Sequence, residues 1–138
     1  MSHTRLPARA TGLAAALGLA ATLLTAAPAS AAPDWETLSR LDEARLQACK
    51  VPVDGGDAWR VRLRLRNGND YRVKSTVTVL RGGNATDRRW RSGWVPSGEG
   101  EAGAVRAGTG AGWQLSFSVS ADELGGGGTR SVSSVGRC

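Results

Sequence analysis

The sequence predicts an all-β domain, an antiparallel sandwich of about seven short strands with a short helix before them and one disulfide across them. Three observations support this prediction. Residues 59–65 and 113–119 alternate apolar and polar side chains with the period of two that a half-buried strand requires. Turn-forming residues separate the predicted strands at intervals of about 8 to 12 residues. The chain also holds an even pair of cysteines, Cys49 and Cys138.

The chain begins with the features of a secretory signal peptide. A positive start without acidic residues precedes an apolar run at residues 12–27, and small residues at 29–31 match an A-x-A cleavage site. The run is shorter than the roughly twenty residues that span a bilayer. We therefore expect residues 1–31 to be a cleaved signal and residues 32–138 to be one secreted, extracellular domain, with no transmembrane segment after signal removal. A retained N-terminal anchor is the alternative.

Export makes a disulfide the expected state of the two cysteines, because thiols oxidise outside the cytoplasm. A Cys49–Cys138 bridge would tie the end of the predicted helix to the last residue. It would close a loop of about 90 residues, for which the chain-entropy model gives roughly 4 to 5 kcal/mol. The alternative is two separate thiols, with Cys138 bonded to another chain.

A helix is expected at about residues 35–48, where Asp34 can cap its start. Apolar residues recur there at helical spacing between charged ones: Trp35, Leu38, Leu41 and Ala44. Pro52 lies beyond its expected end near Cys49.

The clearest basic strand follows at residues 59–66. Its apolar side chains are Trp59, Val61, Leu63 and Leu65, and its basic ones are Arg60, Arg62, Arg64 and Arg66. After a turn at residues 67–70, a second alternating run spans residues 71–79, with Ser75 as the one polar member of its apolar side. The two runs either form a hairpin, which sets arginine opposite arginine, or lie in different sheets, which relieves that repulsion.

Further strands are expected at residues 50–54, 89–95, 102–107, 113–120 and 130–138. The four glycines at residues 125–128 are expected to form a flexible loop. About seven short strands in about 100 residues favour an immunoglobulin-like sandwich.

Four segments resemble fibronectin type III and immunoglobulin-like modules of bacterial extracellular proteins: RVRLRLRN, VKSTVTVLRGG, WVPSGEGEAGAV and GWQLSFSV. This resemblance covers about residues 57–121. The whole chain, with its Ala-rich start, its LQACKV stretch and its terminal cysteine, is similar to small secreted actinobacterial proteins of unknown function. The resemblance implies a sandwich and an exported protein, but it implies no activity, because fold does not supply function.

Catalysis is disfavoured by the residue inventory. His3, the one histidine, lies in the predicted signal, so the remaining chain has no histidine relay and no imidazole ligand. The two cysteines are expected to be bonded, and the pairs of adjacent acids lie in surface-type segments. We therefore expect a protein that is not an enzyme, with no cofactor and no metal site.

Positive charge is concentrated in one part of the chain. Residues 60–91 hold ten basic groups against Asp70 and Asp87, whereas the net charge of the whole chain is +6. The candidate anion-binding residues are Arg60, Arg62, Arg64, Arg66, Arg72 and Lys74. Arginine binds phosphate and carboxylate with two parallel hydrogen bonds, so the expected partners are an anionic cell-wall polymer or an acidic polysaccharide. The alternative is that these arginines only keep a strand surface hydrated and unpaired.

Five tryptophans raise the question of a sugar-stacking site. Trp35, Trp59 and Trp113 are in phase with aliphatic residues and are expected in the core. Trp90 and Trp94 are expected either in the core or half exposed beside arginines.

Two functions therefore remain. The first is a non-catalytic extracellular binding module with a basic face for anionic cell-surface partners. The alternative is a diffusible inhibitor or protein-interaction domain, which would bind another secreted protein through a loop at residues 96–103.

Overall fold

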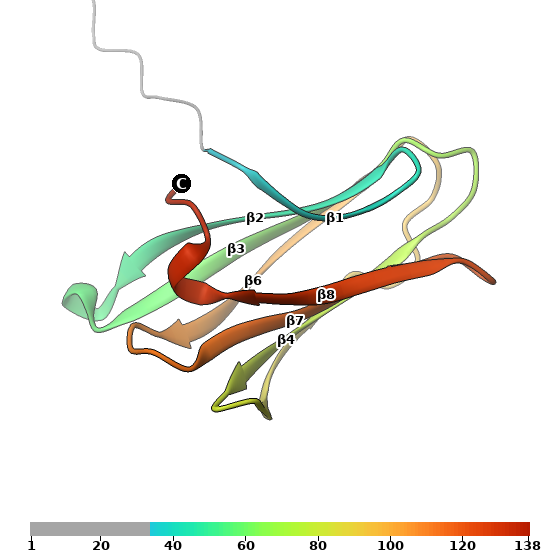
Figure 1. The fold of residues 1–138 in the computed structure, drawn as a ribbon. Helices are drawn as coiled ribbons and strands as arrows, with labels where there is room; N and C mark the ends of the chain where they lie inside the picture. Colours follow the sequence, from blue (N-terminus) through green and yellow to red (C-terminus); the bar gives the residue numbers. More distant parts are fainter. Residues whose placement is uncertain (1–33) are drawn as a thin grey trace, which may run out of the picture. The chain divides into compact units, whose positions relative to one another are not determined.

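A computed structural model describes residues 34–138, which form two antiparallel four-stranded sheets (Figure 1). The first sheet has the order β1-β2-β3-β6, and the second has the order β5-β4-β7-β8. The strands are β1 (Glu36–Leu41), β2 (Ala44–Val53), β3 (Ala58–Asn67), β4 (Lys74–Arg81), β5 (Asn84–Arg91), β6 (Gly100–Gly108), β7 (Trp113–Ser120) and β8 (Gly125–Ser131). The predicted all-β class is confirmed. The predicted signal peptide, residues 1–31, lies outside the described residues.

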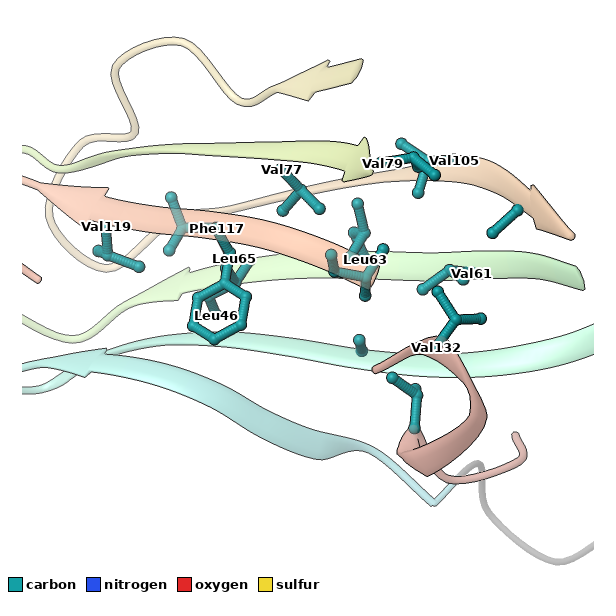
Figure 2. Close-up of a cluster of buried hydrophobic side chains, with 14 of the residues drawn as sticks. Leu46, Val61, Leu63, Leu65, Val77, Val79, Val105, Phe117, Val119 and Val132 are labelled. Atoms are coloured by element: carbon teal, nitrogen blue, oxygen red, sulfur yellow. The ribbon is translucent and has the colours of Figure 1, made fainter. Parts of the chain in front are cut away.

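The two sheets enclose a hydrophobic core built from alternate residues of their strands (Figure 2). The central strands supply Val61, Leu63 and Leu65 from β3, and Leu115, Phe117 and Val119 from β7. All of these side chains are buried, and their sequence neighbours point outward. The alternation predicted for these two strands is confirmed, and it leaves the odd-numbered residues of β3 inside and its arginines outside.

The second alternating run does not return beside the first. β3 pairs with β2 and β6 in one sheet, whereas β4 pairs with β5 and β7 in the other. Arg64 therefore lies opposite Gln47 and Ala102. The crossing between sheets avoids setting Arg64 opposite Arg72 and Arg62 near Lys74, as a hairpin would do.

The helix predicted at about residues 35–48 is wrong, because these residues form the β1–β2 hairpin. The register of β1 against β2 shifts between Thr37 and Ser39. Such a bulge resets the alternation, so Leu38 and Leu41, three residues apart, both pack against the core. This spacing in a bulged strand is the same as that of a helix face, which explains the error.

The glycine run predicted as a loop is instead part of strand β8. The strands number eight rather than the predicted seven because β1 lies where a helix was predicted. A Cβ atom on Gly127 would stand 2.3 Å from the carbonyl oxygen of Phe117. At Gly128, a Cβ atom would stand 3.4 Å from the Phe117 ring. The close approach of β7 therefore requires glycine at position 127, whereas the contact at position 128 is an ordinary one. The strand predicted at residues 130–138 is wrong beyond Ser131, where a short 3₁₀ turn, η2 (Val132–Ser134), follows.

The predicted disulfide between Cys49 and Cys138 is present. The chain end continues the first sheet along β2, where β1 has already ended. Lys50 donates its backbone N–H to Gly136 at 2.9 Å, and Cys138 donates its own to Lys50 at 3.0 Å. The disulfide and these hydrogen bonds together attach the C-terminus to β2.

Lys50 points into this end of the sandwich and is 5% exposed. Its Nζ donates to the carbonyl oxygens of Val132 at 2.8 Å and Ser133 at 2.7 Å. Burial and the nearby charge of Arg137 lower the pKa of Lys50, and Glu36 partly opposes them. The ammonium thereby holds turn η2 against β2. Among residues 34–138, no helix is long and apolar enough to cross a membrane.

Two asparagines organise the opposite end of the sandwich. Asn67 is 2% exposed, and its Nδ2 donates to the carbonyl oxygens of Tyr71 at 2.8 Å and Val95 at 2.9 Å. Asn69 is also buried, and it donates to Leu41 in the hairpin between β1 and β2. The segment that the sequence predicts as a turn thus joins both sheets.

The hydroxyl of Tyr71, the protein's one tyrosine, donates to the carboxylate of Asp42 at this same end. This hydrogen bond, followed by desolvation and the charges of Asp42 and Asp70, raises the pKa of Tyr71 to about 12. Because the folded pKa lies above the unfolded value of about 10, the contact stabilises the fold below pH 10 and loses that effect as pH rises towards 12.

Ultraviolet titration of this single phenol is therefore expected to report a pKa of about 12. In the Asp42→Asn variant, the value should fall towards the ordinary phenol value of about 10. Equal values in the two proteins would contradict the assigned hydrogen bond.

Candidate anion-binding face

The four arginines of β3 all point away from the core, because they alternate with its buried residues. The register extends this set across the sheet: Arg66 lies opposite Arg45 of β2, and Arg45 lies opposite Arg40 of β1. At the other end, Arg60 lies opposite Arg106 of β6. Residues directly opposite each other in neighbouring strands share a face. The arginine face is therefore defined as Arg40, Arg45, Arg60, Arg62, Arg64, Arg66 and Arg106.

Most of this positive charge has no carboxylate partner. Within residues 34–138, ion pairs join Arg72 to Asp122, Arg106 to Asp54, and Arg130 to Glu36. Only the second of these involves the arginine face. The four guanidinium groups of β3 lie outside these ion pairs.

Arg64 is the one of the four whose guanidinium makes a hydrogen bond within the described chain. Its Nε donates to Oε1 of Gln47 at 2.9 Å, and its Cζ lies 4.2 Å from the centroid of the Trp35 ring. Partial burial, and then the charge of Arg66, lower the pKa of Arg64. An arginine remains charged at neutral pH despite such a shift, so Arg64 is a positioned cation in the middle of the row.

The row ends in a depression beside β6. Arg60, Arg62 and Arg106 line an open cavity of about 460 Å³ with Gly103 and Ala104. Ala104, which lies opposite Arg62, is the small side chain that β6 presents to this hollow. Three arginines and Asp54 therefore line one hollow, and Asp54 pairs with Arg106 there.

Arg72 and Lys74, which were predicted with the β3 arginines, lie elsewhere. Arg72 precedes β4, and Lys74 is the first residue of β4, which belongs to the other sheet. Their cationic groups lie over the ring of Trp94, with Arg72 Cζ at 4.3 Å and Lys74 Nζ at 4.7 Å from its centroid. The structure thus brings together four of the six candidate residues and separates two, because the chain changes sheet at residues 68–73.

Three members of the arginine face were not among the predicted anion-binding residues. Arg40 and Arg45 were assigned to a helix, and Arg106 stands alone in a strand with a weak pattern. The alternation Ala44-Arg45-Leu46 was the signal that could have placed Arg45 on an outward face.

The tryptophans divide between core and surface. Trp59, Trp90 and Trp113 are partly buried against the core. The expectation for Trp35 is wrong, because its ring lies on the outer face beneath Arg62 and Arg64. Trp94 is 40% exposed and follows β5, which spans Asn84–Arg91 rather than the predicted residues 89–95.

In the described part of the chain, no three His, Cys, Asp or Glu side chains are grouped so that they could hold a metal ion. No protein family, curated protein or solved structure matches this chain. The geometry of the arginine face is therefore the basis for assigning a function.

Proposed function

We propose that this protein is a secreted, non-catalytic binding module that holds anionic polymers of the cell surface on its arginine face. The observation that supports the proposal is the row formed by Arg60, Arg62, Arg64 and Arg66, whose charges no carboxylate of residues 34–138 neutralises. Uncompensated charges on one face raise the local concentration of a polyanion. Binding of this kind releases counterions and therefore weakens steeply with salt.

We also propose an immunoglobulin-like topology for the sandwich. With β1 set aside, β2-β3-β6 stand in one sheet and β5-β4-β7-β8 in the other. This order is similar to the A-B-E and C′-C-F-G division of immunoglobulin-like modules. The disulfide supports an extracellular location, because such bonds persist in oxidising compartments.

The proposed function is tested by co-sedimentation with isolated cell walls. We expect the protein to pellet with walls at 50 mM salt and to lose about 50-fold in affinity by 200 mM, the change expected for about four neutralised charges. The double variant Arg60→Gln, Arg62→Gln should lose most of the pelleting at low salt. Both side chains are exposed and lie outside the ion pairs above, so the substitutions should leave the fold intact.

A matched control carries the same loss of charge on the other sheet. Arg89 and Arg91 of β5 are exposed and lie opposite Thr78 and Thr76 on the outer face of that sheet. The variant Arg89→Gln, Arg91→Gln should pellet like the wild type. Equal loss in both variants would show that net charge rather than the arginine face governs binding.

A second candidate is a protein-interaction domain, supported by the exposed Trp94 and Leu124. Arg72 connects them, because it stacks on Trp94 and lines a hollow together with Leu124. The loop expected for this role is shorter than predicted, since β6 already begins at Gly100. Salt-tolerant binding to another secreted protein, weakened by Trp94→Ser and unaffected by Arg62→Gln, would favour this candidate.

A further inference from the structure

We infer that the ligand of the arginine face is an extended polyol-phosphate polymer in which three carbons bridge successive phosphates. The inference rests on the proposed function and names the chemical class of its ligand. Three features of the face support it: the spacing of the β3 arginines, the occupied face of Trp35, and the cavity at the end of the row.

The first feature is spacing. Alternate residues of a strand stand about 6.8 Å apart, so the row from Arg60 to Arg66 extends over roughly 20 Å. A phosphodiester repeat with a three-carbon bridge has about as many backbone bonds as two amino-acid residues, and fully extended it spans about 7 Å. Such a polymer running along β3 therefore presents one phosphate to each arginine. A single compact anion would contact only part of the row.

The second feature is the ring face of Trp35 that arginine covers. It bears on nucleic acids, because three carbons also separate their successive phosphates. Binding of single strands commonly depends on bases that stack on exposed aromatic rings. The tryptophan of this face is Trp35, and Arg64 already lies over its ring at 4.2 Å, with Arg62 at 5.7 Å. The ring face beneath Arg64 is therefore not open to a stacking base, and a polymer without bases satisfies the arginine face equally well.

The third feature is the hollow lined by Arg60, Arg62 and Arg106, with Asp54 paired to Arg106 as its one acidic lining residue. Its volume of about 460 Å³ accommodates a phosphate together with its bridging carbons. Because it lies where the β3 row meets β6, it can receive one end of the polymer. The ion pair with Asp54 holds Arg106 in place before the ligand arrives.

The test compares synthetic oligomers that carry equal charge at different spacing. Propane-1,3-diol phosphate oligomers of increasing length reproduce the three-carbon bridge, and hexaethylene glycol phosphate oligomers hold the same number of phosphates much farther apart. The dissociation constant is measured by fluorescence anisotropy at several salt concentrations. For the propanediol series, the slope of log K against log salt should steepen with length and level off near −3, because each neutralised phosphate contributes about −0.7.

The widely spaced oligomers should bind at least tenfold more weakly at equal phosphate number, with a slope near that of one phosphate, about −0.7. The variant Arg60→Gln, Arg62→Gln should reduce the propanediol slope by about 1.4, and Arg89→Gln, Arg91→Gln should leave it unchanged. Oligothymidylate of equal length should match the propanediol oligomer.

The unfavourable outcomes are distinguishable. Binding that ignores spacing would overturn this inference and leave the proposed function standing. Tenfold tighter binding of oligothymidylate would overturn the assignment to a polymer without bases. Absence of binding to every oligomer and to cell walls would overturn both the inference and the function on which it rests.

Discussion

Replacement of both cysteines by alanine is expected to lower the free energy of unfolding by about 4 to 5 kcal/mol. Cys49 and Cys138 are 89 residues apart, so their bond closes almost the whole described chain into one loop. Without the bond, the unfolded chain gains the entropy of that loop, while the folded protein loses the covalent attachment of its C-terminus to β2. Domains of this size are stable by about 5 to 15 kcal/mol, so a large part of the stability should disappear.

Urea unfolding of the wild type and of Cys49→Ala, Cys138→Ala measures this change directly. Wild-type protein unfolded with a reducing agent present is the matched control, because it breaks the bond without removing the sulfur atoms. Both should show the same loss to within about 1 kcal/mol, since Cys49 is small and its truncation leaves little cavity. A loss of unfolding free energy below about 1 kcal/mol would mean that Lys50 and the backbone hydrogen bonds of Gly136 and Cys138 keep the C-terminus on β2 without the disulfide.

The second large effect is expected from Asn67→Asp, which should destabilise the protein by about 3 kcal/mol or more at neutral pH. The substitution keeps the size of the side chain but removes both donors. The carbonyl oxygen of Tyr71 would then lose this donor, and that of Val95 would keep only the N–H of Val73; both would face a buried negative charge. That amide bonds both segments that cross between the sheets at this end: residues 68–73, between β3 and β4, and residues 92–99, between β5 and β6.

The pH dependence of this variant separates the charge effect from a packing effect. Burial and the two facing carbonyl oxygens should raise the folded pKa of the new carboxyl above its unfolded value of about 3.9. The destabilisation should therefore be small below about pH 4 and grow as pH rises through the folded pKa. Asn84→Asp, the same substitution at an exposed position, should change stability by less than about 0.5 kcal/mol. A pH-independent loss at Asn67 would contradict the assigned donors.

The expected effects of Asn67→Asp concern an end of the sandwich of which the sequence predicts only the turn. Asparagine and glycine after β3 identify a turn, because their side chains and backbones favour such conformations. Nothing in the local pattern indicates that Asn67 is buried or that it bonds residues 28 positions away. Burial of this kind depends on where both crossings meet, which is a property of the assembled sheets.

The same difference between local pattern and tertiary contact explains why β1 was predicted as a helix and the glycines of β8 as a loop. Leu38 and Leu41 have helical spacing in the sequence, and only pairing with β2 across a bulge makes them a strand. The glycines of β8 have low strand propensity, and at Gly127 the close approach of β7 leaves no room for a Cβ atom. In both elements, contacts with distant strands override the local preference.

What the sequence by itself determined is the direction of each side chain within the strongly alternating strands. The period of two is a property of the extended backbone, so it placed Arg60, Arg62, Arg64 and Arg66 on one face and identified the core residues between them. The two cysteines likewise allowed a single intramolecular pairing.

Only the tertiary structure decided which strands lie side by side. It moved Arg72 and Lys74 to the other sheet, and it brought Arg40, Arg45 and Arg106 to the arginine face. The physical reason is that pairing depends on the packing of segments far apart in the chain, whereas alternation requires only neighbouring residues.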